Sequence, residues 1–134
     1  MDLTKKFPRS PYVMISGIVM LPRTIDKCKA DITRTIGEYH YGCPLDQGVF
    51  DFLGVNKEEF QKKVKELESE ENIAGWIEGF NKSKKDKDNF NNKMRHSMPE
   101  DESSKKWLES EKKKLGKHDY FSYFDNLDAD EKRF

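Results

Sequence analysis

Gly37-Glu38-Tyr39-His40-Tyr41-Gly42-Cys43-Pro44-Leu45-Asp46 is the stretch around which the chain is organised, and no other segment is as rich in side chains able to do chemistry. Its two glycines permit backbone angles that other residues avoid. Cys43 should be extended, because the residue before a proline is kept out of the helical region. The stretch therefore predicts a shaped loop that delivers Cys43 to the start of a short helix at Pro44.

The residues before this loop have a helical pattern. Apolar side chains recur there at spacings of three and four, with charged residues on the other faces: Ile25, Cys28, Ile32 and Ile36. We expect an amphipathic helix over residues 24–36, on which Cys28 is a small buried side chain and not a reactive thiol. Earlier in the chain, Ser10-Pro11 predicts a short helix or turn, followed by an apolar connector over residues 18–21.

Three helical patterns follow the loop. Residues 45–53 contain an apolar cluster that Gly54 ends, which is typical of a short helix. Residues 56–67 open with the spacing of a capping box and continue with an apolar stripe, which makes this the clearest helix of the chain. Residues 69–80 repeat that pattern after a serine.

The last third of the chain is more highly charged. Residues 81–103 hold few apolar side chains, so we expect a loosely anchored crossing segment with at most one weak helix. A further helix is predicted over residues 104–115. The closing run over residues 119–127 carries four aromatic side chains within five residues, too many to leave in water, and should dock on the core or on a partner.

Length and composition favour one domain with a small core. The chain has 134 residues, of which 37% are charged and 34% are hydrophobic. No alternation typical of a β-strand extends over a convincing length. We therefore expect an all-α, compact single domain over residues 1–134, built from five or six short helices, with its core in residues 10–80 and 104–127.

The charge distribution argues against nucleic-acid binding. Residues 1–80 carry 11 Lys and Arg against 13 Asp and Glu, and residues 81–134 carry 14 against 12. Within the second part, basic and acidic runs alternate, which favours mutual compensation over one extended basic face. A nucleic-acid partner is therefore not expected.

Membrane contact and export are not expected either. The apolar run over residues 12–21 is too short for a bilayer, which needs about 20 apolar residues. Pro22-Arg23 follows it where a signal peptide would need a small-residue cleavage site. Two cysteines are too few for a disulfide scaffold. These features predict a cytoplasmic protein.

His40, Cys43 and Asp46 are spaced three apart and leave several chemical interpretations open. A thiol at a helix start can act as a nucleophile or redox group, with His40, Asp46 or Asp26 as base or orienting group. The same three residue types bind metals, but zinc normally needs four ligands in a more regular frame. Asp46 also fits a purely structural role as a helix cap or dipole partner. Since no cofactor or metal motif is present, we expect neither.

Several motifs resemble those of a small bacterial family catalogued as a domain of unknown function. They are LPRTIDK at residues 21–27, GEYHYGCPLD at 37–46 and FDNLDADE at 124–131. The resemblance implies a bacterial source and a helical domain, but no activity. The residues that match the family pattern are Arg23, Asp26, Tyr39, Tyr41, Cys43 and Asp46. The chain departs from it at Lys132, where relatives are expected to have glycine.

Two functional hypotheses follow. The first is a non-enzymatic binding or interaction protein, in which Arg23 and Asp26 at a helix start meet the loop over residues 38–46. Tyr39, Tyr41, Cys43 and Asp46 would complete a polar site for a small anionic ligand or a peptide. The alternative is a thiol-dependent enzyme or redox protein that uses Cys43. The first hypothesis requires Arg23 to lie close to the loop, and the sequence leaves the ligand and the oligomeric state open.

Overall fold

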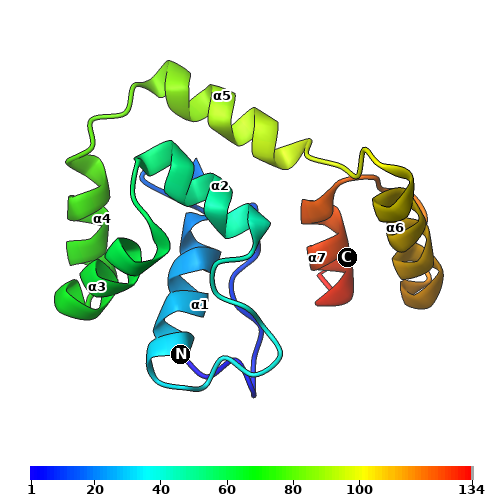
Figure 1. Ribbon diagram of the computed structural model, residues 1–134, viewed down its shortest axis with the longest axis horizontal. Coiled ribbons are helices and arrows are strands. Elements are labelled where there is room, and N and C mark those ends of the chain that lie inside the picture. Colours follow the sequence, from blue (N-terminus) through cyan, green and yellow to red (C-terminus); the bar gives the residue numbers. More distant parts are fainter. Residues whose placement is uncertain (134) are drawn as a thin grey trace.

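A computed structural model of the chain describes residues 1–133. A small antiparallel hairpin precedes seven helices in this part of the chain (Figure 1): β1 (Met14–Ile15), β2 (Ile18–Val19), α1 (Leu21–Ile32), α2 (Pro44–Leu53), α3 (Lys57–Leu67), α4 (Glu70–Glu78), α5 (Lys84–Arg95), α6 (Glu102–Leu115) and α7 (Tyr123–Asp130). The prediction of a mostly helical single domain is confirmed. The helices number one or two more than expected.

The hairpin replaces the short helix that Ser10-Pro11 predicted. Met14 pairs with Val19 and Ile15 with Ile18, around a turn in which Ser16 and Gly17 both have positive φ. Strands of two residues are too short for alternation to be visible in the sequence. The hairpin places Ile18 and Val19 in the core without exposed surface, directly before α1.

Helix α1 begins three residues earlier than predicted and ends four residues earlier. Proline lies in its first turn, where the missing N–H costs no helical hydrogen bond. The backbone leaves the helix at Thr33, and Arg34 then adopts φ +60. The residues after α1 therefore belong to the loop, which makes that loop longer than the sequence indicated.

Helices α2, α3 and α4 follow the predicted pattern closely. Cys43 is the extended residue before α2, with ψ 168. The side chains of Asn56 and Ser69 accept hydrogen bonds from the backbone N–H groups of Glu59 and Asn72, and so cap α3 and α4. These capping residues were visible in the sequence, which explains why the helix boundaries were predictable here.

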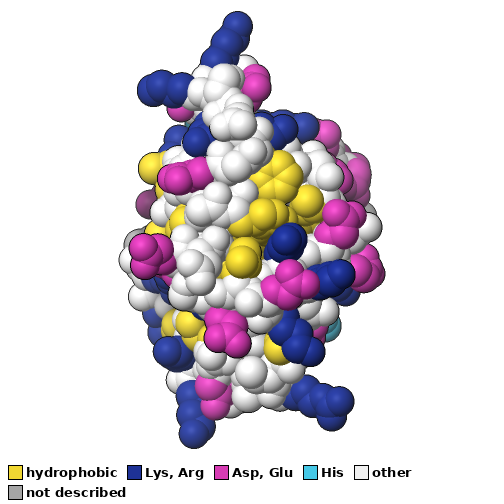
Figure 2. Space-filling view, turned by 90° about the vertical axis from the view of Figure 1, so that its left-hand side faces the viewer, with side chains coloured by type: hydrophobic (Ala, Val, Ile, Leu, Met, Phe, Trp, Pro, Cys, Tyr) yellow, Lys and Arg dark blue, Asp and Glu magenta, His cyan; other side chains and the backbone are white. Residues whose placement is uncertain are grey.

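The main core lies between α1, α2, α3 and α4. The rings of Phe50 and Phe60 are 5.1 Å apart between centroids, and the partly buried Trp76 lies 5.9 Å from Phe60. Cys28 is fully buried in this cluster, as the helical pattern predicted. Figure 2 shows the side of the molecule that carries α3 and α4, where charges of both signs surround a small apolar area.

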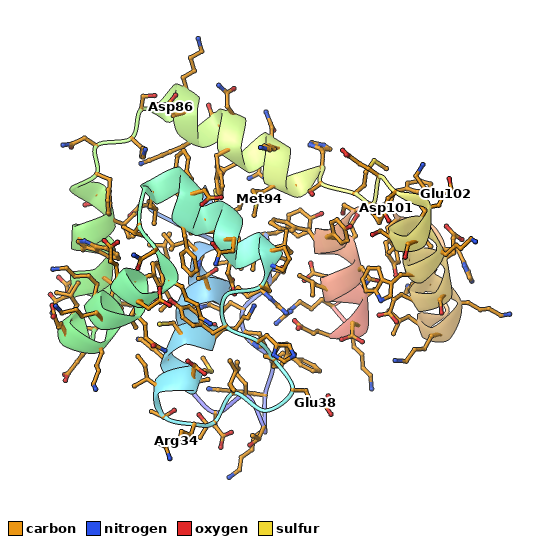
Figure 3. The ribbon with its side chains drawn as sticks, viewed as in Figure 1. Arg34, Glu38, Asp86, Met94, Asp101 and Glu102 are labelled. Carbon is orange, nitrogen blue, oxygen red and sulfur yellow. The ribbon has the colours of Figure 1, made fainter. Side chains whose placement is uncertain are left out.

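Helix α5 crosses from α4 to the α6 side over α2 (Figure 1). Asn91 anchors it to the hairpin by accepting from the Val19 N–H at 3.0 Å and donating to the Gly17 carbonyl at 2.8 Å. Phe90 stacks on Phe52 of α2 at 4.4 Å. Met94 points toward α2 (Figure 3), where its sulfur covers Gly48. The loose anchoring expected for residues 81–103 stays a prediction.

Helices α6 and α7 lie together at the opposite end from α3 and α4 (Figure 1). They share a second, smaller apolar cluster of Leu108, Tyr120 and Ala129. Phe124 of α7 is instead fully buried in the main core, where its ring packs edge-on against Tyr12 at 5.2 Å. Of the four aromatic side chains in the closing run, Phe124 therefore docks on the main core and Tyr120 on the smaller cluster, whereas Phe121 is 62% exposed. No helix within residues 1–133 is long and apolar enough to cross a membrane.

Candidate functional site

The loop after α1 is held against the N-terminal segment. Gly37 has φ +64, and a Cβ there would lie only 3.3 Å from the Leu3 carbonyl oxygen. The Leu3 N–H donates to the Thr35 carbonyl at 2.8 Å. Gly37 thus provides both the left-handed backbone and the close approach that this contact needs. The loop then turns toward α2, and the buried Tyr41 donates its hydroxyl to the Lys57 carbonyl at 2.7 Å.

Asp46 fastens the loop and α2 to α1. Its side chain is fully buried, and Oδ1 accepts from the Thr24 hydroxyl at 2.6 Å. Oδ2 accepts from Lys27 Nζ at 2.8 Å and from the backbone N–H groups of Gly42 and Cys43 at 2.9 and 3.3 Å. Four donors leave Asp46 little capacity to accept a further hydrogen bond from a ligand. Its geometry supports the structural role that the sequence left open.

Arg23 lies beside the loop, as predicted. Its guanidinium carbon is 5.6 Å from the centroid of the Tyr39 ring. The charge partner, however, is Glu131, just after α7: Nη1 and Nη2 donate to its two carboxylate oxygens at 2.9 and 2.6 Å. The Tyr39 hydroxyl donates to the same carboxylate at 2.8 Å. Arg23 and Glu131 are 1% and 3% exposed, so this is a buried bidentate pair.

Asp26 is paired as well, with Arg9 of the N-terminal segment. The Arg9 backbone N–H and Nε donate to Oδ2 at 2.9 and 3.1 Å, and Nη2 donates to Oδ1 at 3.0 Å. The same Nη2 lies 2.6 Å from a Glu70 carboxylate oxygen at the start of α4. Asp26 is therefore buried and occupied by an internal partner.

A further group of polar residues extends this arrangement along α7. Ser10 donates to Asp128 Oδ2 at 3.0 Å, and Arg133 contacts both Glu131 and the Pro8 carbonyl. Asp128 Oδ1 has no hydrogen-bond partner among the described residues. Together with the two pairs above, these contacts form a buried polar network that joins α1, the N-terminal segment, the loop and the end of α7.

The charges in this network show clear pKa shifts. Burial alone would raise the pKa of Glu131, but the hydrogen bonds and charge of Arg23 outweigh it, so that this pKa is lowered from 4.5. Burial, with the hydrogen bond to Glu131, raises the pKa of Tyr39 and keeps its hydroxyl protonated. Burial also raises the pKa of Asp128 above 3.8, which fits its incompletely paired carboxylate.

The two cysteines differ in their surroundings. Cys43 is partly exposed, and its sulfur lies 3.2 Å from Lys27 Nζ. Burial raises the pKa of the Cys28 thiol to about 12, so this thiol stays protonated at neutral pH. His40 lies exposed on the loop between Tyr39 and Tyr41. Within residues 1–133, no group of three or more His, Cys, Asp or Glu side chains is placed to hold a metal ion.

An open hollow of about 820 Å³ adjoins the network. Its lining combines the N-terminal segment, the loop and the end of α7: Leu3, Thr4, Lys5, Lys6, Phe7, Gly37, Glu38, Tyr39 and Asp130. Figure 3 shows Glu38 on the loop, on the side where α7 lies. Phe7 is 49% exposed, and both lysines are exposed. The hollow thus offers aromatic surface with charges of both signs.

Of the predicted site residues, Arg23 and Asp26 lie in the buried network, Asp46 is buried beside Thr24 and Lys27, and only Tyr39 also reaches the hollow. Sequence reasoning missed Glu131, Thr24, Lys27 and Arg9. Glu131 and Lys27 do lie within the quoted motifs, but the sequence of a motif does not show which residue a charged side chain pairs with. Apart from their charge, nothing in the sequence indicated that Lys5 and Lys6 line a hollow.

One comparison with known proteins supports a family of unknown function, and another found nothing. A search of curated proteins found no match. A family model described as "Domain of unknown function (DUF5069)" matches residues 5–133, which is nearly the whole chain. The chain therefore belongs to the DUF5069 family.

Proposed function

We propose that this protein is a non-enzymatic binding protein and that its ligand is a short peptide held in the hollow beside Tyr39. The observation that carries the proposal is the lining of this hollow. The volume of the hollow, about 820 Å³, lies within the size range of ligand pockets. Lys5 and Lys6 suit a carboxylate, whereas Glu38 and Asp130 suit an amino group. The rings of Phe7 and Tyr39 suit an apolar side chain between them.

In this proposal the ligand binds in the hollow and not at Arg23, where the sequence analysis placed it. Arg23 and Asp26 are both buried and occupied by charged partners of the same chain. An anionic group of a ligand would have to displace Glu131 from Arg23, and a cationic group would have to displace Arg9 from Asp26. Breaking a buried pair costs about 3–5 kcal/mol. The exposed lysines of the N-terminal segment are available without that cost. The network instead gives Tyr39 a fixed position.

An NMR titration with synthetic tripeptides tests the proposal. Tripeptides with free termini and a central Leu or Phe are added to ¹⁵N-labelled protein, and shift changes are expected at residues 3–7, 37–39 and 130. Reversing the charge in Lys5→Glu/Lys6→Glu should weaken binding about tenfold or more. The matched control is Lys105→Glu/Lys106→Glu, an exposed lysine pair on α6. Shifts that spread elsewhere, or no shifts at millimolar peptide, contradict the proposal.

A thiol-dependent enzyme is a second candidate, favoured by one observation: Cys43 lies at the start of α2 with Lys27 Nζ 3.2 Å from its sulfur. The three candidates for the general base of such an enzyme are poorly suited to that role. Asp46 and Asp26 are bonded to residues of the same chain, and His40 is exposed on the loop. Iodoacetamide labelling at pH 7 separates the candidates. Alkylation of Cys43 many times faster than that of free cysteine supports the enzyme, and ordinary or slower labelling supports the binding protein.

A further inference from the structure

The contact between Lys27 and Cys43 joins a nucleophile to an oxidisable group. Lys27 Nζ lies 3.2 Å from Cys43 Sγ and 2.8 Å from Asp46 Oδ2. The Lys27 side chain is only 5% exposed. Lysines are almost never buried unless they are paired, and the partner here is Asp46. We propose that Cys43 and Lys27 form a reversible covalent cross-link under oxidation, in which peroxide converts the thiol to a sulfenic acid and the lysine amine captures the sulfur.

The two cysteines of the chain should respond to peroxide differently. Oxidation follows solvent access and thiolate character. Cys43 is partly exposed at the start of α2, so that peroxide can reach its sulfur. Cys28 is fully buried, and burial holds its thiol in the protonated form. Cys28 therefore serves as an internal control within the same molecule.

The position of the amine makes capture faster than further oxidation. Lys27 projects from α1, and Asp46 holds its ammonium group against the sulfur. Asp46 is itself fixed by Thr24 and by two backbone N–H groups, so the three reacting groups have little freedom to separate. Groups held together in this way react as though at very high concentration.

The chemistry balances with peroxide as the only added oxidant. Peroxide oxidises Cys43–SH to Cys43–SOH and is reduced to water. The Lys27 ammonium then gives one proton to the Asp46 carboxylate, and the free amine attacks sulfur. The S–O bond breaks, the S–N bond forms, and the hydroxyl leaves as water with the second amine proton. The products are a sulfenamide, Cys43–S–NH–Lys27, and a neutral Asp46. Two equivalents of a small thiol reverse the link and become a disulfide.

The buried surroundings favour this product. Lys27 and Asp46 form a charge pair with side chains 5% and 0% exposed, and buried charges are costly even when paired. The cross-link converts both to neutral groups without exposing either to water. Its covalent bond also replaces the lost ion pair as the connection between α1 and the start of α2.

Peptide mapping of the oxidised protein tests the proposal. The full chain is treated with hydrogen peroxide, unreacted thiols are blocked, and the digest is analysed without reducing agent. We expect a peptide that joins Lys27 to Cys43, lighter than its two components by two hydrogens, and its disappearance after treatment with dithiothreitol. Mapping individual peptides keeps methionine oxidation from obscuring the result.

Two variants serve as the matched comparison. Lys27→Arg keeps a cation beside Asp46 but removes the nucleophilic amine, so the linked peptide should fall at least about tenfold, while sulfinic acid at Cys43 increases. Lys29→Arg, on the same helix, should leave the yield unchanged. Wild-type mapping does not depend on either variant folding. Sulfinic or sulfonic acid at Cys43 of the wild type with an unmodified Lys27, or equal oxidation of Cys28, overturns the proposal.

Discussion

Arg23 on α1 and Glu131 after α7 are separated by 108 positions in the chain, yet form a buried bidentate ion pair with distances of 2.9 and 2.6 Å. The pair connects the first helix to the last. The Tyr39 hydroxyl donates to the same carboxylate, so the loop is held at the same point. Motif residues that look like a ligand site in the sequence thus hold together three separate segments.

Tyr39→Phe should lower the free energy of unfolding by about 1.5–3 kcal/mol, because it removes a hydrogen bond to a charged group while keeping the ring beside Arg23. Urea denaturation followed by circular dichroism measures the change. Tyr123→Phe, at the half-buried start of α7, is a suitable control and should cost less, because the change keeps the ring beside Trp107. Equal stability of the Tyr39 variant and the wild type contradicts the network geometry.

The free energy of unfolding should depend on pH through the titration of Glu131. The pKa of Glu131 in the folded protein is below its ordinary value of 4.5, since the hydrogen bonds and charge of Arg23 outweigh burial. The stabilisation from this carboxylate is therefore complete above about pH 4.5 and is lost as the pH falls through the lowered pKa. The stability difference between wild type and Glu131→Gln should shrink below pH 4.5. A difference that is constant from pH 7 to 3 contradicts this assignment.

Asn91→Ala should destabilise the protein by about 1–3 kcal/mol, since it leaves the Val19 N–H and the Gly17 carbonyl without their partner. Asn92→Ala, an exposed neighbour on the same helix, should change little. Hydrogen exchange in wild type should also show a gradient along α5. Amides near Asn91 and Met94 should be better protected than those in the first turn. Uniformly fast exchange along α5 would show that Asn91 does not anchor it.

Lys132→Gly should stabilise the protein by up to about 1 kcal/mol. Lys132 is exposed and has φ +58, in the left-handed region that costs a residue with a side chain about 1–2 kcal/mol. Glycine removes this strain but gains about 0.4–1 kcal/mol of entropy in the unfolded chain, which offsets part of it. Thermal unfolding compares the two proteins, with Lys117→Gly as a control of different backbone geometry. A lower melting temperature for Lys132→Gly contradicts the strain argument.

The sequence predicted those parts of the fold that depend on local signals. Helices α3 and α4 have side-chain caps at Asn56 and Ser69, and α2 begins at Pro44 and is followed by Gly54. All three helices lie where these signals place them. The hairpin was missed because two-residue strands leave no periodic pattern. The proximity of Arg23 to the loop was predicted from chain geometry, and the contact with Tyr39 confirms it.

The partners within the site could not be predicted, because they depend on long-range packing. Nothing near Arg23 in the sequence distinguishes Glu131 from Glu38 or Asp46 as its carboxylate. Docking of Phe124 in the core brings the end of α7 to α1 and thereby selects Glu131. The hollow likewise exists only because the N-terminal segment folds against Gly37, which its composition does not reveal.

A double-mutant cycle of Arg23 and Glu131 measures whether Arg23 is committed to Glu131 and not to a ligand. Arg23→Met and Glu131→Leu should each cost about 3–5 kcal/mol of unfolding free energy. Glu131→Leu leaves the buried Arg23 without its carboxylate, and Arg23→Met leaves the buried Glu131 with only Tyr39 and the less buried Arg133. The double variant should cost less than the sum by about 2–3 kcal/mol. Losses that add to within about 0.5 kcal/mol would contradict the claim and return Arg23 to the candidates for ligand binding.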